Sequence, residues 1–131
     1  MTKMLRWYLR LLAGLTIISC LGQLGLPAQL GAASAWGVAP GWQREIAFWD
    51  LAMYILIART LRANDAVGGR TAAIALVVLQ LLVATKHAAA TIQTHAMLNA
   101  IMAAVNYGCV VFGTLALSRR AAGQDLAGRA A

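Results

Sequence analysis

The sequence predicts an all-α membrane protein, a bundle of four transmembrane helices with both termini in the cytoplasm. Of its 131 residues, 61% are hydrophobic and 11% are charged, whereas about a quarter of the residues in a soluble domain are charged. So few charged groups would not cover the surface of a soluble protein. The apolar residues also form long runs, and the basic residues collect at the ends of these runs. We therefore expect lipid as the solvent and no nucleic-acid partner, despite a net charge of +7.

The apolar runs define a single transmembrane domain over residues 1–131, with a cytoplasmic tail at 118–131. The expected spans are 8–30, 43–61, 72–90 and 96–117. Each is long enough, at about 1.5 Å per residue, to cross a hydrocarbon core about 30 Å thick with modest tilt or thinning. Ala33-Ser34-Ala35 resembles a signal-peptidase site, but the apolar run continues to Leu30, so we expect an uncleaved first span.

The three connections between the spans differ in chemistry. Pro40-Gly41 breaks the chain before the second span, and Asn64-Asp65 starts a polar turn after it. The third connection contains neither Gly nor Pro. An unbroken helix over 71–118 would be roughly 72 Å long, more than twice the hydrocarbon thickness. We therefore expect the chain to turn within the polar segment Thr91–His95.

The distribution of basic residues predicts the orientation. In a four-span chain, Arg44 and Lys86 fall toward one side of the membrane. The remaining basic residues share the other side: Lys3, Arg6, Arg10, Arg59, Arg62, Arg70, Arg119, Arg120 and Arg129. The positive-inside rule places that side, and with it both termini, in the cytoplasm. This pattern is typical of a multi-pass protein of the bacterial inner (cytoplasmic) membrane.

Aromatic residues concentrate near the expected span ends. They are Trp7, Tyr8, Trp36, Trp42, Phe48 and Trp49. We interpret them as interfacial anchors. The alternative is an aromatic cage around a ligand.

A polar cluster is expected near the outer face, where the third and fourth spans meet. If these spans pack antiparallel about a turn near Gln93, residues at equal depth form the pairs Gln80–Asn106, His87–Asn99 and Thr91–His95. One interpretation is that these groups hold the two helices together. The other is an outward-facing polar pocket formed by His87, His95 and Asn99, open to water or to a lipid headgroup.

Two charged residues inside the spans are expected to pair. Asp50 and Lys86 lie at comparable depth on the second and third spans, and Lys86 lies off the face that carries His87. We predict an Asp50–Lys86 ion pair, because charges within a membrane usually find a partner. The alternative is that Lys86 extends alone to the outer interface.

The sequence gives no signature of catalysis or of a cofactor. Cys20 and Cys109 are isolated within apolar runs, so neither a zinc site nor a dithiol motif is supported. His87 and His95 are only eight residues apart at one turn, which is not a haem signature. A copper or zinc site with Met97 would lack a third strong ligand. We therefore expect no catalytic residue and no metal site, and we disfavour haem or metal bound through His87 and His95.

Two stretches carry a resemblance to a known group of proteins. "KMLRWYLRLLAGL" (3–15) and "EIAFWDLAMYILIA" (45–58) resemble small four-span bacterial membrane proteins of the BphX-like and DoxX-like kind. The resemblance covers these stretches and the span pattern. It implies a four-span fold, and some DoxX-like proteins resemble subunits of quinone-linked oxidoreductases. It carries over no catalytic residue.

The expected function is that of a non-catalytic accessory or assembly subunit of a larger membrane complex. Its expected partners are membrane lipids and either that complex or further copies of this chain. The alternative is a quinone- or cation-binding component of a membrane oxidoreductase or transporter, which would use the outer polar cluster.

Overall fold

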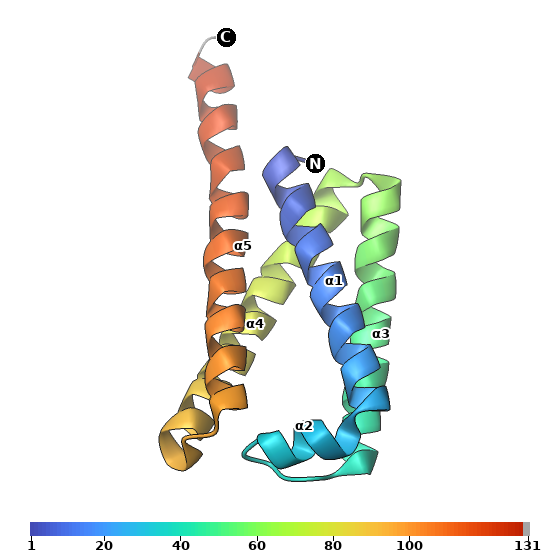
Figure 1. Cartoon of the computed structure of the whole chain (residues 1–131). Coiled ribbons are helices and arrows are strands. Elements are labelled where there is room, and N and C mark those ends of the chain that lie inside the picture. Colours follow the sequence, from blue (N-terminus) through green and yellow to red (C-terminus); the bar gives the residue numbers. More distant parts are fainter. Residues whose placement is uncertain (130–131) are drawn as a thin grey trace.

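A computed structural model describes the backbone of residues 1–129 and the side chains of residues 1–118. This part of the chain consists of five helices without a strand, which confirms the all-α class. In order they are α1 (Lys3–Gly25), α2 (Pro27–Ala33), α3 (Pro40–Ala63), α4 (Ala66–Thr94) and α5 (Met97–Arg129) (Figure 1). The side chains of Arg119, Arg120 and Arg129 in the expected tail lie outside the described side chains.

Three helical segments are long and apolar enough to cross a membrane. They are Lys3–Gly25, Ala66–Thr94 and Met97–Ser118. They correspond to the expected first, third and fourth spans. The expected second span falls in α3, which carries charged residues near both ends and Asp50 between them.

The first helix ends earlier than the sequence analysis predicted. The expected span reached Leu30, but α1 ends at Gly25 and α2 begins at Pro27. Proline has no N–H to continue the helix, and it disfavours helical geometry at the residue before it. Leu26 accordingly leaves the helical region, with φ −130° and ψ 41°. The short α2 then runs across the end of α1 (Figure 1).

α1 and α3 form an antiparallel pair that is fastened at both ends. Near the start of α1, Arg6 Nη2 donates to Asn64 Oδ1 at 3.0 Å, just beyond the end of α3. At the other end of the pair, Gln43 Nε2 donates to the carbonyl oxygen of Pro27 at 2.7 Å. These two bonds tie the ends of α3 to the start of α1 and to the start of α2.

α4 and α5 form the second antiparallel pair. The turn between them falls at His95, within the polar segment Thr91–His95 where a turn was expected. His95 adopts a left-handed conformation (φ 56°), and its N–H donates to the Thr91 carbonyl at 2.8 Å. α4 extends past the expected end at residue 90, so the turn lies slightly later than Gln93.

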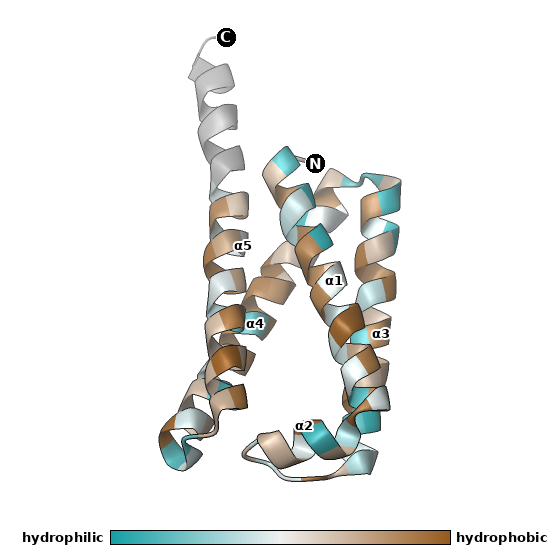
Figure 2. Cartoon of the chain, viewed as in Figure 1, coloured by the Kyte–Doolittle hydropathy of each residue, from teal (hydrophilic) through white to brown (hydrophobic). Residues whose placement is uncertain are grey.

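The two pairs meet at the end of the molecule where α1 begins and diverge toward the α4–α5 turn (Figure 1). The core lies at the meeting point and draws on four helices: Leu5, Tyr8, Leu9, Leu12, Ile57, Ala73, Leu76, Cys109 and Ala116. Gly113 permits the close approach, because a Cβ there would lie 2.5 Å from Val77 Cγ2 and 2.6 Å from Tyr8 Cζ. Hydrophobic residues predominate along the described helices between the two ends of the molecule (Figure 2).

Candidate functional site

At the end of the molecule that is expected to face outward, near the α4–α5 turn, lies a cluster of Trp36, Lys86, His87 and Asn99, the outer polar cluster. Lys86 and His87 lie on α4, less than three turns before its end, and Asn99 lies in the first turn of α5. Trp36 comes from the loop between α2 and α3. The turn lies at the end of the molecule opposite the start of α1 (Figure 1).

His87 and Asn99 form the central contact of the cluster. His87 Nδ1 lies 3.3 Å from Asn99 Oδ1, a long but acceptable hydrogen bond. An amide oxygen can only accept, so this bond requires the proton on Nδ1 of the imidazole. Asn99 is fully buried, and its Nδ2 has no partner within the described part of the chain. The structure therefore brings together two of the three residues of the expected pocket.

Trp36 covers this contact from the loop. The centroids of the Trp36 and His87 rings are 4.9 Å apart, and the ring planes meet at 68°. Lys86 Nζ lies 4.9 Å from the centroid of the Trp36 ring, in cation–π geometry. The loop is shaped locally: Ser34 Oγ donates to the Gly31 carbonyl and accepts from the Trp36 N–H. The position of Trp36 near an expected span end predicted an interfacial anchor, and no local sequence pattern predicted these contacts.

His95 is exposed at the turn and makes no side-chain hydrogen bond within the described chain. Thr91, its expected partner, donates instead to the His87 carbonyl of its own helix at 2.9 Å. His95 thus stands apart from the His87–Asn99 contact, and its backbone geometry serves to end α4.

Deeper along this pair of helices, Asn106 is buried, and its Nδ2 donates to the Met102 carbonyl of its own helix at 2.6 Å. Gln80 is half-buried on α4. No hydrogen bond joins the two side chains in the described structure. Thr85 Oγ1 and Tyr107 Oη, 3.4 Å apart, provide the neighbouring polar contact between α4 and α5.

Asp50 and Lys86 do not form the expected ion pair. Lys86 extends over Trp36, whereas Asp50 faces α1, where Ser19 is its neighbour. Asp50 Oδ2 is shielded from solvent and has no hydrogen-bond partner in the part of the chain that the structure describes. The physical reason is the packing: α3 lies along α1 and diverges from α4 at this end of the molecule (Figure 1). Similar depth therefore did not make these two residues neighbours.

The described side chains contain no group of three His, Cys, Asp or Glu residues that could hold a metal ion. Cys20 and Cys109 are free, buried thiols on different helices. The described hydrogen-bond partner of the His87 side chain is the amide of Asn99, which is neither a nucleophile nor an acid. The cluster can therefore position an imidazole, but it does not form a nucleophile–base arrangement.

No family model, curated protein or solved structure matches the chain. The resemblance to BphX-like and DoxX-like proteins stays a prediction.

Proposed function

We propose that the chain is a non-catalytic accessory or assembly subunit of a larger complex in the bacterial inner membrane, crossing it four times with both termini in the cytoplasm. The observation that carries the proposal is how the polar and the large apolar side chains are distributed. The polar groups of the outer cluster contact one another between helices, while large apolar side chains are exposed.

The geometry of α3 supports a fourth span. Its 24 residues extend about 36 Å at 1.5 Å per residue. Asp50 is half-buried on the side of α3 that faces α1, and its Oδ2 is shielded from the exterior. Arg44 and Glu45 lie near one end, and Arg59 and Arg62 near the other, where long side chains can reach the interface.

The exposed face of α3 supports a role in assembly. Trp42, Phe48, Trp49 and Ile55 are 58%, 62%, 73% and 51% exposed. Trp42 and Trp49 are spaced i, i+7, as are Phe48 and Ile55, so the four side chains form two adjacent apolar rows on one side of α3. Large exposed apolar patches mark membrane or protein contacts, and aromatic residues often anchor protein interfaces.

Native gel electrophoresis after extraction in a mild detergent tests the assembly role. We expect a complex larger than the monomer, which the double variant Phe48→Ala/Trp49→Ala loses. Leu82→Ala is the control, because Leu82 is exposed to a similar extent, 64%, but lies on α4. A wild-type chain that migrates as a monomer, or equal losses in both variants, would refute the proposal.

Reporter fusions test the topology separately. A fluorescent protein that folds in the cytoplasm should be bright at either terminus, and a phosphatase active outside the cytoplasm should be silent at both. Opposite results at the two ends would indicate an odd number of spans and exclude the four-span arrangement.

Unpaired acceptor oxygens favour a second candidate, a cation-binding component. Gln23 Oε1, Gln43 Oε1 and Asp50 Oδ2 are all buried without a donor among the described residues. Gln43 and Asp50 share one face of α3 at i, i+7 spacing, and Gln23 lies on α1, against which α3 packs. Oxygen acceptors without donors suit a hard cation.

Thermal unfolding in detergent with sodium, potassium or magnesium chloride tests this candidate. At least one of these three cations should raise the melting temperature of the wild type but not that of Asp50→Asn. Equal shifts in both proteins would contradict it. Choline chloride at the same ionic strength controls for general salt effects.

A further inference from the structure

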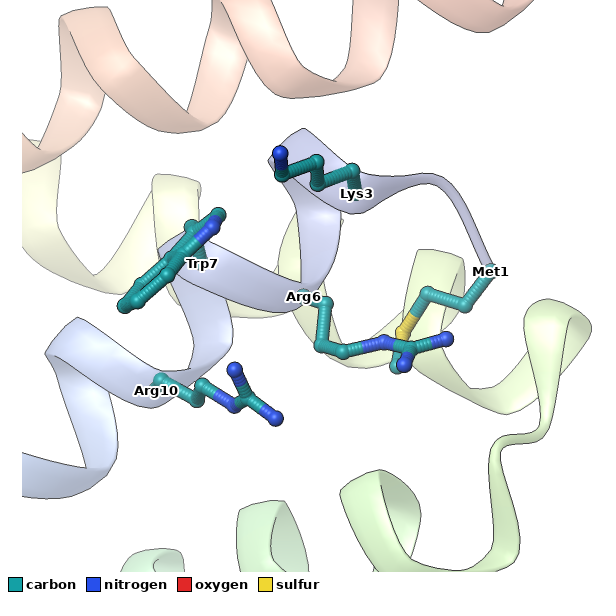
Figure 3. A pocket seen from close by; sticks show the side chains of 5 residues that line it. All are labelled: Met1, Lys3, Arg6, Trp7 and Arg10. Carbon is teal, nitrogen blue, oxygen red and sulfur yellow. The ribbon is translucent and has the colours of Figure 1, made fainter.

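A hollow of about 490 Å³ lies at the start of α1, at the opposite end from the outer polar cluster. It is lined by Met1, Lys3, Arg6, Trp7 and Arg10 (Figure 3). The last four residues follow i, i+3, i+4, i+7 spacing and share one face of α1. Three of the five lining residues are cationic, and none is acidic.

The cations of this basic hollow keep donors available. The Arg10 guanidinium lies 5.3 Å from the centroid of the Trp7 ring, which holds it beside the hollow. Arg6 is oriented by the bond of its Nη2 to Asn64, and its Nε is shielded from solvent, so it contributes positive charge to the hollow, whereas Lys3 and Arg10 are exposed. No Asp or Glu precedes Glu45 in the sequence, so this part of α1 offers no internal counter-charge.

An apolar groove of about 450 Å³ adjoins the basic hollow. It is lined by Trp7, Arg10, Leu11 and Phe112, and so runs between α1 and α5. Trp7 and Arg10 line both spaces, so the groove lies directly beside the hollow. Leu11 and Trp7 are 43% and 54% exposed, so the groove is open to an external ligand.

We propose that the hollow and groove together bind one anionic phospholipid, with its phosphate among Lys3, Arg6 and Arg10 and an acyl chain along Leu11 and Phe112. Guanidinium groups bind phosphate oxygens with two parallel hydrogen bonds. A free phosphate would use the hollow alone, whereas a lipid uses both spaces. A zwitterionic headgroup would bring an ammonium group toward three cations, so the site selects a headgroup of net negative charge. The proposal rests on the membrane location proposed above but not on the number of spans or on a partner subunit.

Native mass spectrometry of delipidated protein in detergent tests the proposal. Titration with phosphatidylglycerol should give one retained lipid per chain, and phosphatidylcholine should be retained about tenfold more weakly or worse. The double variant Lys3→Gln/Arg10→Gln should lose this preference. Both side chains are exposed and make no described hydrogen bond, so the variant is expected to fold.

Arg59→Gln/Arg62→Gln is the matched control, because it removes the same charge from another helix at the same end of the molecule. It should retain phosphatidylglycerol as the wild type does. Equal losses in the two double variants would mean diffuse attraction to basic residues and overturn the proposal.

Leu11→Asn should weaken retention of the lipid without affecting binding of inorganic phosphate. Displacement of the lipid by inorganic phosphate at equal concentration would overturn the lipid assignment.

Discussion

Asn99 is buried completely on α5, and its Oδ1 lies 3.3 Å from His87 Nδ1 on α4. The contact crosses the two helices close to their turn. It leaves His87 half-buried, with Trp36 over its ring. The imidazole thus has one amide partner and one aromatic neighbour, an arrangement that fits a contact holding the hairpin together.

Asn99→Ala should lower the free energy of unfolding, because it removes the acceptor for His87. A double-mutant cycle with His87→Ala should give a coupling of about 0.6 kcal/mol, and at most ~1.7 kcal/mol, the range for polar contacts between membrane helices. Reversible unfolding of the protein in mixed detergent and dodecyl sulfate micelles provides the measurement. A coupling of zero would contradict a stabilising role. Thr114→Ala is the control, because Thr114 bonds only to its own helix.

His95 should act through its backbone rather than through its imidazole. Its φ of 56° suits glycine, whereas a β-branched residue is strained there. His95→Gly should therefore unfold at nearly the same denaturant concentration as the wild type, and His95→Val should lose about 1–2 kcal/mol. If His95→Gly were as unstable as the valine variant, the side chain would contribute a contact of its own.

Tyr8 combines a fully buried ring with a hydroxyl that has no hydrogen-bond partner among residues 1–118. Its ring packs edge-on against Phe112 at 5.8 Å, an interaction that phenylalanine would keep. Tyr8→Phe should thus raise the free energy of unfolding by about 1 kcal/mol, since it removes an unsatisfied buried group. Thermal unfolding in detergent measures the change. Destabilisation would show that the hydroxyl has a partner in the folded protein.

The elements that depend on hydropathy and length could be predicted from the sequence. Apolar runs predicted the helices, and the excessive length of an unbroken helix over 71–118 predicted a turn that falls at His95. The break at Leu26 could also have been predicted, because Pro27 is visible inside the apolar run.

The neighbours of the polar side chains could not be predicted in the same way. Helical periodicity shows which residues share a face, but not which helix that face packs against. Asp50 therefore lies against α1 instead of Lys86. The contact of Trp36 with His87 depends on the path of a loop, which no local pattern encodes. The basic hollow at the start of α1 was visible only as a cluster of charges.

Two glycines of α5 provide a matched pair of substitutions. Gly113→Ala should destabilise the protein by about 1–3 kcal/mol, because its Cβ would meet Val77 and the ring of the buried Tyr8. Gly108 has nothing within 4 Å of a Cβ, so Gly108→Ala should be neutral or gain up to ~1 kcal/mol from helix propensity. Equal effects in thermal unfolding would mean that α1, α4 and α5 do not meet at Gly113.

Gly31 determines how the loop after α2 reaches α4. A Cβ at Gly31 would lie 2.7 Å from Val38 Cα and 2.8 Å from the Gly37 carbonyl oxygen, and backbone atoms cannot move aside cheaply. Gly31→Ala should therefore displace the loop and withdraw Trp36 from His87. The indole N–H signal of Trp36 in a ¹⁵N-labelled sample should shift, and the same shift is expected in His87→Ala. Gly25→Ala, where a Cβ meets nothing within 4 Å, should leave that signal in place. An unmoved signal in Gly31→Ala would show that Trp36 reaches His87 without the close crossing at Gly31.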